Sequence, residues 1–237
     1  MVDWLLAPID VTRPHAVAGL VAWHARLMVL GWGILLPAGI FVARFLKITP
    51  RQDWPRVLDN KTWWWLHLFF QYSGVASVLL ALGLIVAGGA HATGLHAVFG
   101  WTVMALTLAQ LVSGLLRGSK GGPTAPGPDG SLDGDHYSMS PRRRAFEHFH
   151  KSVGYLALLL SIVAIVSGLW LVNAPKWMWL GIATWWLSLL GIGAVLQRNG
   201  HAVDTYQAIW GPDPCHPGNQ LPPIGWGIRR KGWKQPP

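Results

Sequence analysis

Cysteine is almost absent from this sequence, since Cys215 is the only one among 237 residues. A chain with a single cysteine forms no internal disulfide. The residues that begin at this position read Cys-His-Pro, and no second cysteine stands three positions earlier. That pattern excludes covalent haem attachment of the c type and leaves a structural or incidental cysteine as the default.

Charged side chains are also scarce. They make up 12% of the chain, whereas soluble domains carry about 25%. This deficit and the long uncharged runs place the chain among membrane proteins. The net charge of +9 is also seen in nucleic-acid-binding proteins, but in a membrane protein basic residues gather in cytoplasmic loops and contact anionic headgroups. We therefore expect membrane lipid, and no nucleic acid, as the partner of these charges.

Five apolar stretches are long enough to cross a bilayer core of about 30 Å as helices. Because lipid cannot satisfy open backbone groups, we expect an all-α membrane protein, an up-and-down transmembrane bundle with a four-helix core and a fifth helix. The bundle should occupy residues 16–197, after a short external segment, 1–15, and before a cytoplasmic Trp/Pro-rich tail, 198–237. The expected spans are Ala16–Arg44, Thr62–Gly88, Thr93–Leu116, Phe149–Val172 and Pro175–Gln197.

The segments between the spans differ in charge. Those on one side, including the tail, hold 16 of the 19 lysines and arginines, and the other side has only Arg13, Arg26 and Lys176. The positive-inside rule then puts the N-terminus outside and the C-terminus in the cytoplasm, and we expect the inner (plasma) membrane of a prokaryote.

Residues 118–141 predict a flexible cytoplasmic loop. The tail from His201 is too apolar for simple disorder and too rich in proline for a helix, which favours packing on the cytoplasmic face or against a protein partner.

Tryptophan and proline are predicted to mark the ends and bends of the spans. Pro37 predicts a kink in the first helix, and Pro175 suits the first turn of the fifth. Many of the 16 tryptophans stand where apolar runs begin or end, which is typical of an interfacial aromatic belt. These are Trp63, Trp64, Trp65, Trp177, Trp179, Trp185 and Trp186.

Four of the ten histidines lie near the starts of four apolar stretches. Successive helices of an up-and-down bundle start on opposite sides, so His24 pairs in depth with His96, and His67 pairs with His150. A histidine inside a membrane span is costly and usually functional. The sequence therefore predicts two sites at two depths, each with two imidazoles.

Haem explains two-ligand sites better than a bare metal ion. Zinc and copper gather three or four ligands in one shell, whereas each depth offers two histidines and almost no carboxylate or thiol. Haem brings four equatorial nitrogens itself, and filling both axial positions leaves no open site for oxygen. We expect two haem b groups that transfer electrons. Five glycines on these helices would make room for a flat macrocycle or for close helix packing: Gly31, Gly33, Gly74, Gly100 and Gly154.

Motifs around the histidines occur in a fixed order. They are His24-Ala-Arg-Leu-Met28, then Gly31-Trp-Gly-Ile-Leu-Leu-Pro37-Ala-Gly39, Leu66-His67 with Gln71, His96 with Gly100 and Gln110, and His150 with Gly154 and Gly168. Together they resemble the four-helix core of the cytochrome b561 family, the diheme transmembrane electron carriers. The likeness covers roughly Trp23 to Leu171, and it implies that His24 and His96 ligate one b haem and His67 and His150 the other.

Two neighbouring histidines compete for these roles. His91 lies at the outer edge of the third span and is an alternate ligand there, and His148 stands two residues before His150, on a different helix face. The resemblance selects His96 because the family histidine stands four residues before a glycine, here Gly100, and the same spacing selects His150. The other histidines are expected to be exposed or interfacial: His15, His136, His201 and His216.

The sequence also departs from the family. Its members usually have six helices, with one ahead of the first histidine-bearing helix, so this chain would be a five-helix variant. Family members often take electrons from ascorbate at the cytosolic haem, but the basic residues that support this use have no matched positions here. The run Arg142-Arg143-Arg144 would attract an anionic donor or act as a topology signal.

The sequence thus predicts transmembrane electron transfer through two bis-histidine b haems, one near each membrane face. If the chain is an enzyme, it is an electron-transfer oxidoreductase. The donor and acceptor stay open among ascorbate, quinol and another cytochrome. One alternative is a membrane-anchor cytochrome b subunit that links a redox partner complex to the quinone pool, with the tail as its docking segment. Another is a non-catalytic structural or assembly subunit.

Overall fold

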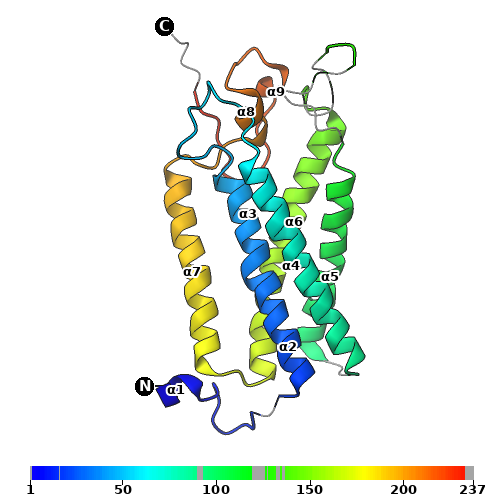
Figure 1. Ribbon diagram of the computed structural model, residues 1–237, viewed down its shortest axis with the longest axis vertical. Helices are drawn as coiled ribbons and strands as arrows, with labels where there is room; N and C mark the ends of the chain where they lie inside the picture. Colours follow the sequence, from blue (N-terminus) through cyan, green and yellow to red (C-terminus); the bar gives the residue numbers. More distant parts are fainter. Residues whose placement is uncertain are drawn as a thin grey trace. The chain divides into compact units, whose positions relative to one another are not determined.

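The structure is a computed structural model, and it describes residues 2–15, 17–89, 93–118, 126, 128–131, 134 and 137–232. The described chain is helical, and its only β pairing is two isolated bridges, which confirms the expected all-α class (Figure 1). The helices are α1 (Val2–Leu6), α2 (Gly19–Met28), η1 (Val29–Leu35), α3 (Leu36–Phe45), α4 (Thr62–Ala87), α5 (Gly94–Leu115), α6 (Pro141–Leu171), α7 (Lys176–Arg198), α8 (Thr205–Trp210) and α9 (Pro217–Gln220).

Five helical segments of the described chain are long and apolar enough to cross a membrane, as the sequence predicts. The first, Gly19–Phe45, is continuous through α2, η1 and α3. The others are α4, α5, α6 and α7. Their lengths of 22 to 31 residues exceed the roughly 20 residues that a helix needs to cross the hydrocarbon core.

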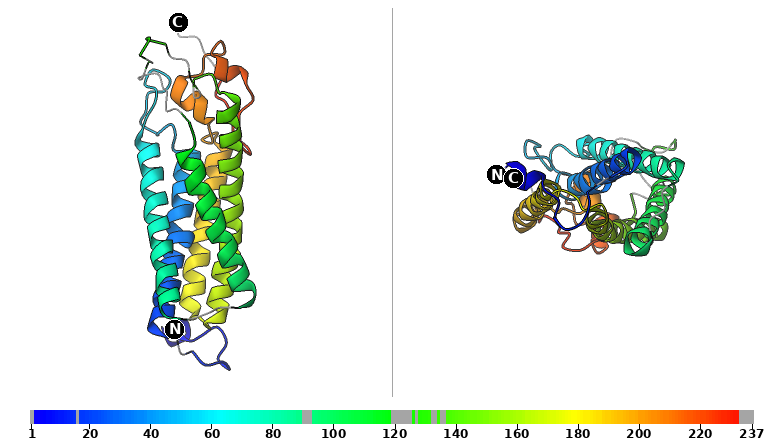
Figure 2. Two further views of the ribbon diagram at one scale, coloured as in Figure 1. Left: turned by 90° about the vertical axis from the view of Figure 1, so that its right-hand side faces the viewer. Right: turned by 90° about the horizontal axis from the view of Figure 1, so that it is seen from below.

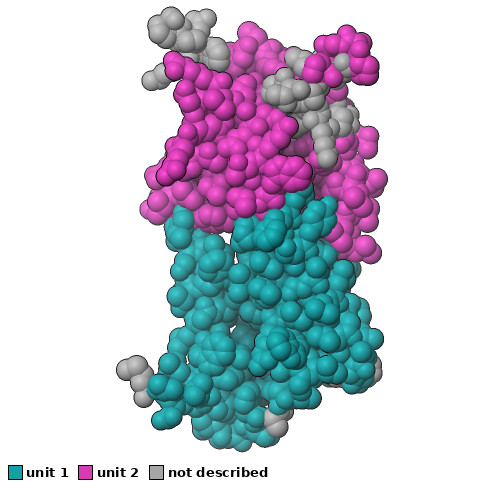
Figure 3. All heavy atoms as spheres, viewed as in Figure 1, with its two compact units in different colours: residues 1–40, 67–107, 156–192 teal, residues 41–66, 108–155, 193–237 magenta. Residues whose placement is uncertain are grey.

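The chain divides into two compact units (Figure 3). Unit 1 comprises Met1–Ile40, His67–Thr107 and Leu156–Ile192, and unit 2 comprises Phe41–Leu66, Leu108–Tyr155 and Gly193–Pro237. Figure 2 (right) shows the long helices seen end-on.

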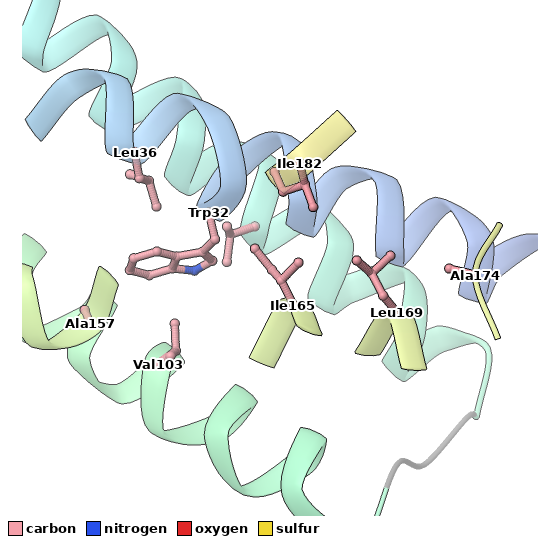
Figure 4. Close-up of a cluster of buried hydrophobic side chains, with 9 residues drawn as sticks. Trp32, Leu36, Val103, Ala157, Ile165, Leu169, Ala174 and Ile182 are labelled. Carbon is pink, nitrogen blue, oxygen red and sulfur yellow. The ribbon is translucent and has the colours of Figure 1, made fainter. Parts of the chain in front are cut away.

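The interior of unit 1 is an apolar cluster around Trp32 of η1. Its indole points toward Val103 of α5 and Ala157 of α6 (Figure 4). The further members of this cluster are Leu36, Val78, Ile165, Leu169, Ala174 and Ile182. Every spanning segment contributes to it, so the cluster ties the helices of unit 1 together by apolar contact.

The first spanning segment changes helix type just before Pro37, where the sequence predicts a kink. Residues 29–35 form a π-helix, a local widening that often accompanies proline-induced bends. Because Pro37 has no N–H, the carbonyl of Gly33 loses its α-helical donor. The indole N–H groups of Trp185 and Trp186 in α7 donate to Gly33 O at 3.0 and 3.1 Å. A neighbouring helix thus satisfies the backbone group that proline leaves open.

This contact corrects the expectation that Trp185 and Trp186 belong to an interfacial belt. Both residues lie in the middle of α7 (Lys176–Arg198) and bond to a backbone carbonyl. The tryptophans of the first turns, such as Trp63 in α4 and Trp177 in α7, do lie at helix ends. Position in an apolar run therefore did not separate packing tryptophans from boundary tryptophans.

The fourth spanning helix begins earlier than expected, at Pro141 rather than Phe149. Proline is favoured in a first helical turn, and Ser140 Oγ accepts the backbone N–H of Arg143 at 3.3 Å. Glu147 then pairs with Arg143 at 3.1 Å and with Lys151 at 2.5 Å, both at a spacing of four residues. These local interactions extend the helix through a charged segment that hydropathy assigns to the loop. Half of residues 118–141, for which the sequence predicts flexibility, lie outside the described residues.

The tail contains helices, which corrects the expectation that it is too rich in proline to form one. The proline-free stretch Thr205–Trp210 forms α8, and Pro217 opens the short α9. An apolar cluster in unit 2 holds this tail together: Met139, Tyr206, Ile209, Trp210 and Ile224. The tail is therefore a folded part of unit 2.

A buried lysine fastens the tail to the rest of unit 2. Lys47 follows α3, is 4% exposed, and donates from Nζ to Val203 O at 2.9 Å. Burial, and to a smaller extent nearby Lys151, lowers the pKa of Lys47 to about 7 against the opposing effect of Glu147. Asp204, next to Val203, pairs with Arg230 at 3.2 Å.

Candidate functional site

The rings of His24 and His96 come together inside unit 1, as predicted from the sequence. Their centroids are 6.3 Å apart and their planes meet at 86°. Two bonds from a metal to imidazole nitrogen take up about 2.0 Å each, which leaves roughly 2 Å for the two segments from nitrogen to ring centre. The separation therefore fits two imidazoles that share one metal centre between them.

Each of these two rings is anchored to a neighbouring helix through Nδ1. His24 Nδ1 bonds to Ala81 O of α4 at 3.0 Å, and His96 Nδ1 bonds to Ala164 O of α6 at 3.0 Å. A carbonyl oxygen only accepts, so Nδ1 carries the hydrogen in both rings. In a neutral imidazole the lone pair then resides on Nε2. A hydrogen bond of this kind orients a metal-ligating histidine.

The approach of His96 to α6 depends on Gly168. A Cβ added at Gly168 would lie 2.9 Å from Cε1 of His96, so any larger residue would push the ring away. Gly100, one turn after His96, differs, because a Cβ there would meet nothing within 4 Å. Space beside Gly100 is thus open in unit 1, as a flat macrocycle next to His96 would require.

The other glycines of the histidine-bearing helices serve packing. A Cβ at Gly31 would lie 2.9 Å from Gly74 O, and one at Gly74 would lie 2.8 Å from Cγ of Leu36. These contacts bring the backbones of η1 and α4 close together. A Cβ at Gly33 would lie 3.0 Å from Ile182, and one at Gly154 would lie 3.6 Å from Gln110.

His67 lies in the part of α4 that belongs to unit 1. Its Nδ1 bonds to Gly39 O of α3 at 3.0 Å, and Gln71 one turn later donates to Leu36 O at 3.2 Å. A Cβ at Gly39 would collide with the Gln71 side chain. The close contact of α3 and α4 therefore sets both the orientation and the tautomer of the His67 ring.

His150 lies in the part of α6 that belongs to unit 2, and it is described there by itself. Its Nδ1 is 2.9 Å from Ser113 Oγ of α5, and that hydroxyl donates to Gln110 O at 2.9 Å. Because a hydroxyl has one hydrogen, Ser113 accepts from His150, and Nδ1 is again the protonated nitrogen. Gln110 Nε2 donates to His150 O at 3.0 Å, so α5 fixes both the backbone and the ring.

All four predicted histidines thus share one local arrangement: each is partly buried and bonds through Nδ1 to a neighbouring helix. The competing His148 is exposed on α6.

The other histidines differ in their surroundings. His91 and His136 lie outside the described residues. Of those expected at the surface, His15 bonds to Val172 O. His216 instead packs among Tyr137, Tyr206 and Trp210 and bonds to Tyr206.

Sequence reasoning missed Ser113 and the acceptor carbonyls. A serine in an apolar helix, three residues after Gln110, is a weak signal for a histidine partner. The carbonyls of Ala81 and Ala164 give no signal at all, because every residue has one. Among the described residues, no three histidine, cysteine or carboxylate side chains gather into a metal-ion cluster. That leaves two-imidazole sites as the arrangement to explain.

Several known membrane cytochromes and reductases are similar to this chain in sequence. A cytochrome b561, DM13 and DOMON domain-containing protein of Arabidopsis thaliana is 34% identical over 148 residues, covering 62% of this chain and 14% of that protein. A cytochrome b561 and DOMON domain-containing protein of the same plant is 28% identical over 163 residues, covering 66% and 33%. Ferric-chelate reductase 1 of Homo sapiens is 26% identical over 166 residues, covering 69% and 24%. No family model and no solved structure matches.

This chain spans one third or less of the length of these three relatives. The relatives are eukaryotic, so the expected prokaryotic membrane stays a prediction. The names of the two plant relatives both contain cytochrome b561, and this likeness implies that the chain binds haem b. Its five apolar helices and its membrane cytochrome relatives make it an integral membrane protein. The similarity to these proteins supports a place for the chain in the cytochrome b561 family.

Proposed function

We propose that this protein carries electrons across a membrane through two b haems, one held by His24 with His96 and the other by His67 with His150. The observation that carries this proposal is the pair His24 and His96, with ring centroids 6.3 Å apart and Nδ1 of each ring committed to a backbone carbonyl. His67 and His150 have the same Nδ1 arrangement, which supports the same role for them.

The chain's own groups prepare each imidazole for iron. The carbonyls of Ala81, Gly39 and Ala164 and the hydroxyl of Ser113 hold Nδ1–H, so Nε2 is the nitrogen that would ligate. These bonds also raise the basicity of the ligand. When bound, each haem supplies a one-electron iron couple whose potential depends on axial ligation, hydrogen bonds and burial.

The rest of unit 1 keeps its interior dry. The cluster around Trp32 places apolar side chains from all the spanning segments in that interior. Low dielectric surroundings favour the less charged state of a redox centre and exclude the water that side reactions need. Two imidazoles at each iron would leave no open position for oxygen, so the chemistry proposed is outer-sphere electron transfer.

The proposed orientation places the N-terminus outside and the C-terminus in the cytoplasm. It rests on the asymmetry of lysine and arginine, 16 of 19 of which lie in alternate connecting segments and the tail. A reporter fused after Pro237 should then be active only in the cytoplasm. Activity on the outer side would reverse the orientation and leave the haem assignment untouched.

Haem content of the purified chain tests the proposal. We expect about two haem b per polypeptide, each with two axial histidines. Electron paramagnetic resonance should show a low-spin signal of large anisotropy, because the planes of His24 and His96 meet at 86°. A colourless protein, or one haem per chain, would contradict the proposal.

Ferric chelates are a candidate acceptor because two relatives carry the name ferric-chelate reductase 1. The reduced protein, mixed anaerobically with ferric citrate, should be reoxidised as the chelate is reduced. A quinone added in a parallel experiment tests the alternative role as a membrane-anchor subunit. Reoxidation by the quinone alone would favour that alternative over a ferric acceptor.

A further inference from the structure

Trp226 is 85% exposed, the largest exposed fraction among the large hydrophobic side chains of the described chain. It lies in the tail, between Gly225 and Gly227, within unit 2. A tryptophan can bury 150–250 Å² on contact with a partner. An exposed tryptophan outside the spanning helices therefore raises the question of which partner it contacts.

The backbone on either side of Trp226 is fixed by three donors from three spanning helices. Arg44 Nη2 of α3 donates to Trp226 O at 2.7 Å, and Gln197 Nε2 of α7 donates to Gly227 O at 2.6 Å. Lys151 Nζ of α6 donates to Ile224 O at 2.9 Å. A loop held at three of the four residues from 224 to 227 is rigid, so the exposure of the indole is built into the fold.

The two flanking glycines are required by this loop. Gly225 has φ of 117° and Gly227 has φ of 62°, both in the region that favours glycine. A Cβ at Gly225 would lie 3.0 Å from Ile228, and one at Gly227 would lie 3.0 Å from Nε2 of Gln197. The backbone is thus shaped to press against unit 2 on both sides of Trp226 and to direct its side chain outward.

The loop lies where two membrane spans end. Arg44 is the last residue but one of α3, and Gln197 is the last residue but one of α7. Ala194, three residues before Gln197 and therefore on the same face of α7, is an exposed apolar residue, as a lipid-facing position requires. The lipid-facing surface of α7 therefore reaches to within one turn of the residue that holds Gly227.

Positive charge accompanies the exposed indole. Arg198, at the end of α7, and Arg229, two residues after Gly227, are both exposed. Tryptophan prefers the boundary between hydrocarbon and headgroups, where its ring is apolar and its N–H stays hydrated. Basic side chains at the same depth attract anionic headgroups, worth about 1 kcal/mol for each lysine or arginine near the surface.

We propose that Gly225–Gly227 is a lipid-binding loop that inserts Trp226 into the headgroup layer beside α3 and α7, with Arg198 and Arg229 contacting anionic lipid phosphates. The depth of the loop at the span ends and its continuity with the lipid-facing side of α7 favour lipid over a soluble protein. The loop would fasten the tail to the membrane surface as well as to unit 2. This proposal does not depend on the haem assignment.

Nitroxide labelling of the full chain in nanodiscs tests the proposal. One sample carries Cys215→Ser with Trp226→Cys, labelled at position 226. The matched control is the native chain labelled at Cys215, which is exposed in the same tail. In discs that contain phosphatidylglycerol, the label at 226 should collide more with oxygen, which concentrates in lipid, than with a water-soluble nickel complex. The label at 215 should show the opposite preference.

Two outcomes would overturn the lipid assignment. A label at 226 that is as accessible to nickel as the label at 215 would show that the loop faces water. A label shielded from both reagents, in neutral and anionic discs alike, would show a protein contact instead. Replacing Arg198 and Arg229 by glutamine should lower the oxygen preference at 226 in anionic discs to its value in neutral phosphatidylcholine discs. An unchanged preference would refute the role of the two arginines.

Discussion

Unit 1 and unit 2 hold their histidines in different ways. In unit 1, His24, His67 and His96 each bond to a backbone carbonyl. In unit 2, His150 bonds to the hydroxyl of Ser113. The interiors differ as well, because the charged side chains that the described chain buries lie in unit 2: Lys47, Arg143, Glu147 and Asp204.

The difference shows what sets the orientation of the histidine rings in each unit. A carbonyl cannot be removed by substitution, so in unit 1 the orientation of a histidine depends on how closely two helices approach, and glycine decides that. In unit 2 the side chain of Ser113 orients His150, and a substitution can remove that side chain. An unpaired charge inside a membrane span costs free energy. In unit 2 the buried charged side chains instead have partners, either one another or residues of the tail.

Removing an axial imidazole should have the largest effect. His96→Leu is expected to lower haem content to about half, because one of the two proposed bis-histidine sites would lose a ligand. His148→Leu should leave haem content intact, since His148 is exposed on α6, and so should His91→Leu. Haem per polypeptide in purified protein measures all three. Equal losses in the three variants would reject the ligand assignment.

Deleting the side-chain anchor in unit 2 should come next. Ser113→Ala removes the acceptor of His150 Nδ1–H, and loss of such an outer partner typically costs about 10–100-fold in metal affinity. Haem titration and redox potentiometry should show one of the two haems altered. Ser113→Thr keeps the hydroxyl and should behave as the native protein. Alteration of both haems, or of neither, would contradict the separate anchoring of His150.

Crowding a histidine in unit 1 tests the carbonyl-anchored type. Gly168→Ala places a Cβ 2.9 Å from Cε1 of His96, and overpacking of this kind costs about 1–3 kcal/mol. The haem at His24 and His96 should bind more weakly or show a shifted spectrum. Gly83→Ala is the control, because a Cβ there meets nothing within 4 Å.

Gly100→Ala sharpens the same comparison. The polypeptide has room for this methyl group, so thermal stability without haem should not fall. If the macrocycle occupies the space beside Gly100, haem content should nevertheless drop. Equal haem content in Gly100→Ala and Gly83→Ala would place the haem elsewhere.

The smallest effect should be a pH dependence that belongs to unit 2. The folded state holds the pKa of Lys47 at about 7, whereas an unfolded lysine titrates near 10.4. Between these values the unfolded chain binds more protons, so this group makes stability rise with pH, by at most about 1.4 kcal/mol per unit. Lys47→Met should flatten that rise in thermal unfolding between pH 7 and 10. An unchanged slope would show that Lys47 is charged in the folded state.

The sequence by itself determined the five spans and the depth pairing of His24 with His96. Apolar length and the alternation of an up-and-down chain suffice for both, since they are local or depend on order alone. The early start of α6 was missed because ion pairs at a spacing of four residues outweigh hydropathy in that segment. The fold of the tail was missed because α8 is only six residues long and is held by contacts distant in sequence.

Only the tertiary structure decided which ring nitrogen of each histidine is held in a hydrogen bond to a neighbouring helix. It also decided which glycine allows the two helices to approach closely enough for that bond. Ala81 lies 57 residues from His24, and Ala164 lies 68 residues from His96. Trp185 and Trp186 resemble boundary residues in the sequence, yet they complete the backbone at Gly33. Composition and periodicity report what one helix prefers, whereas hydrogen bonds between helices depend on which faces meet, and that is set only when all the helices pack.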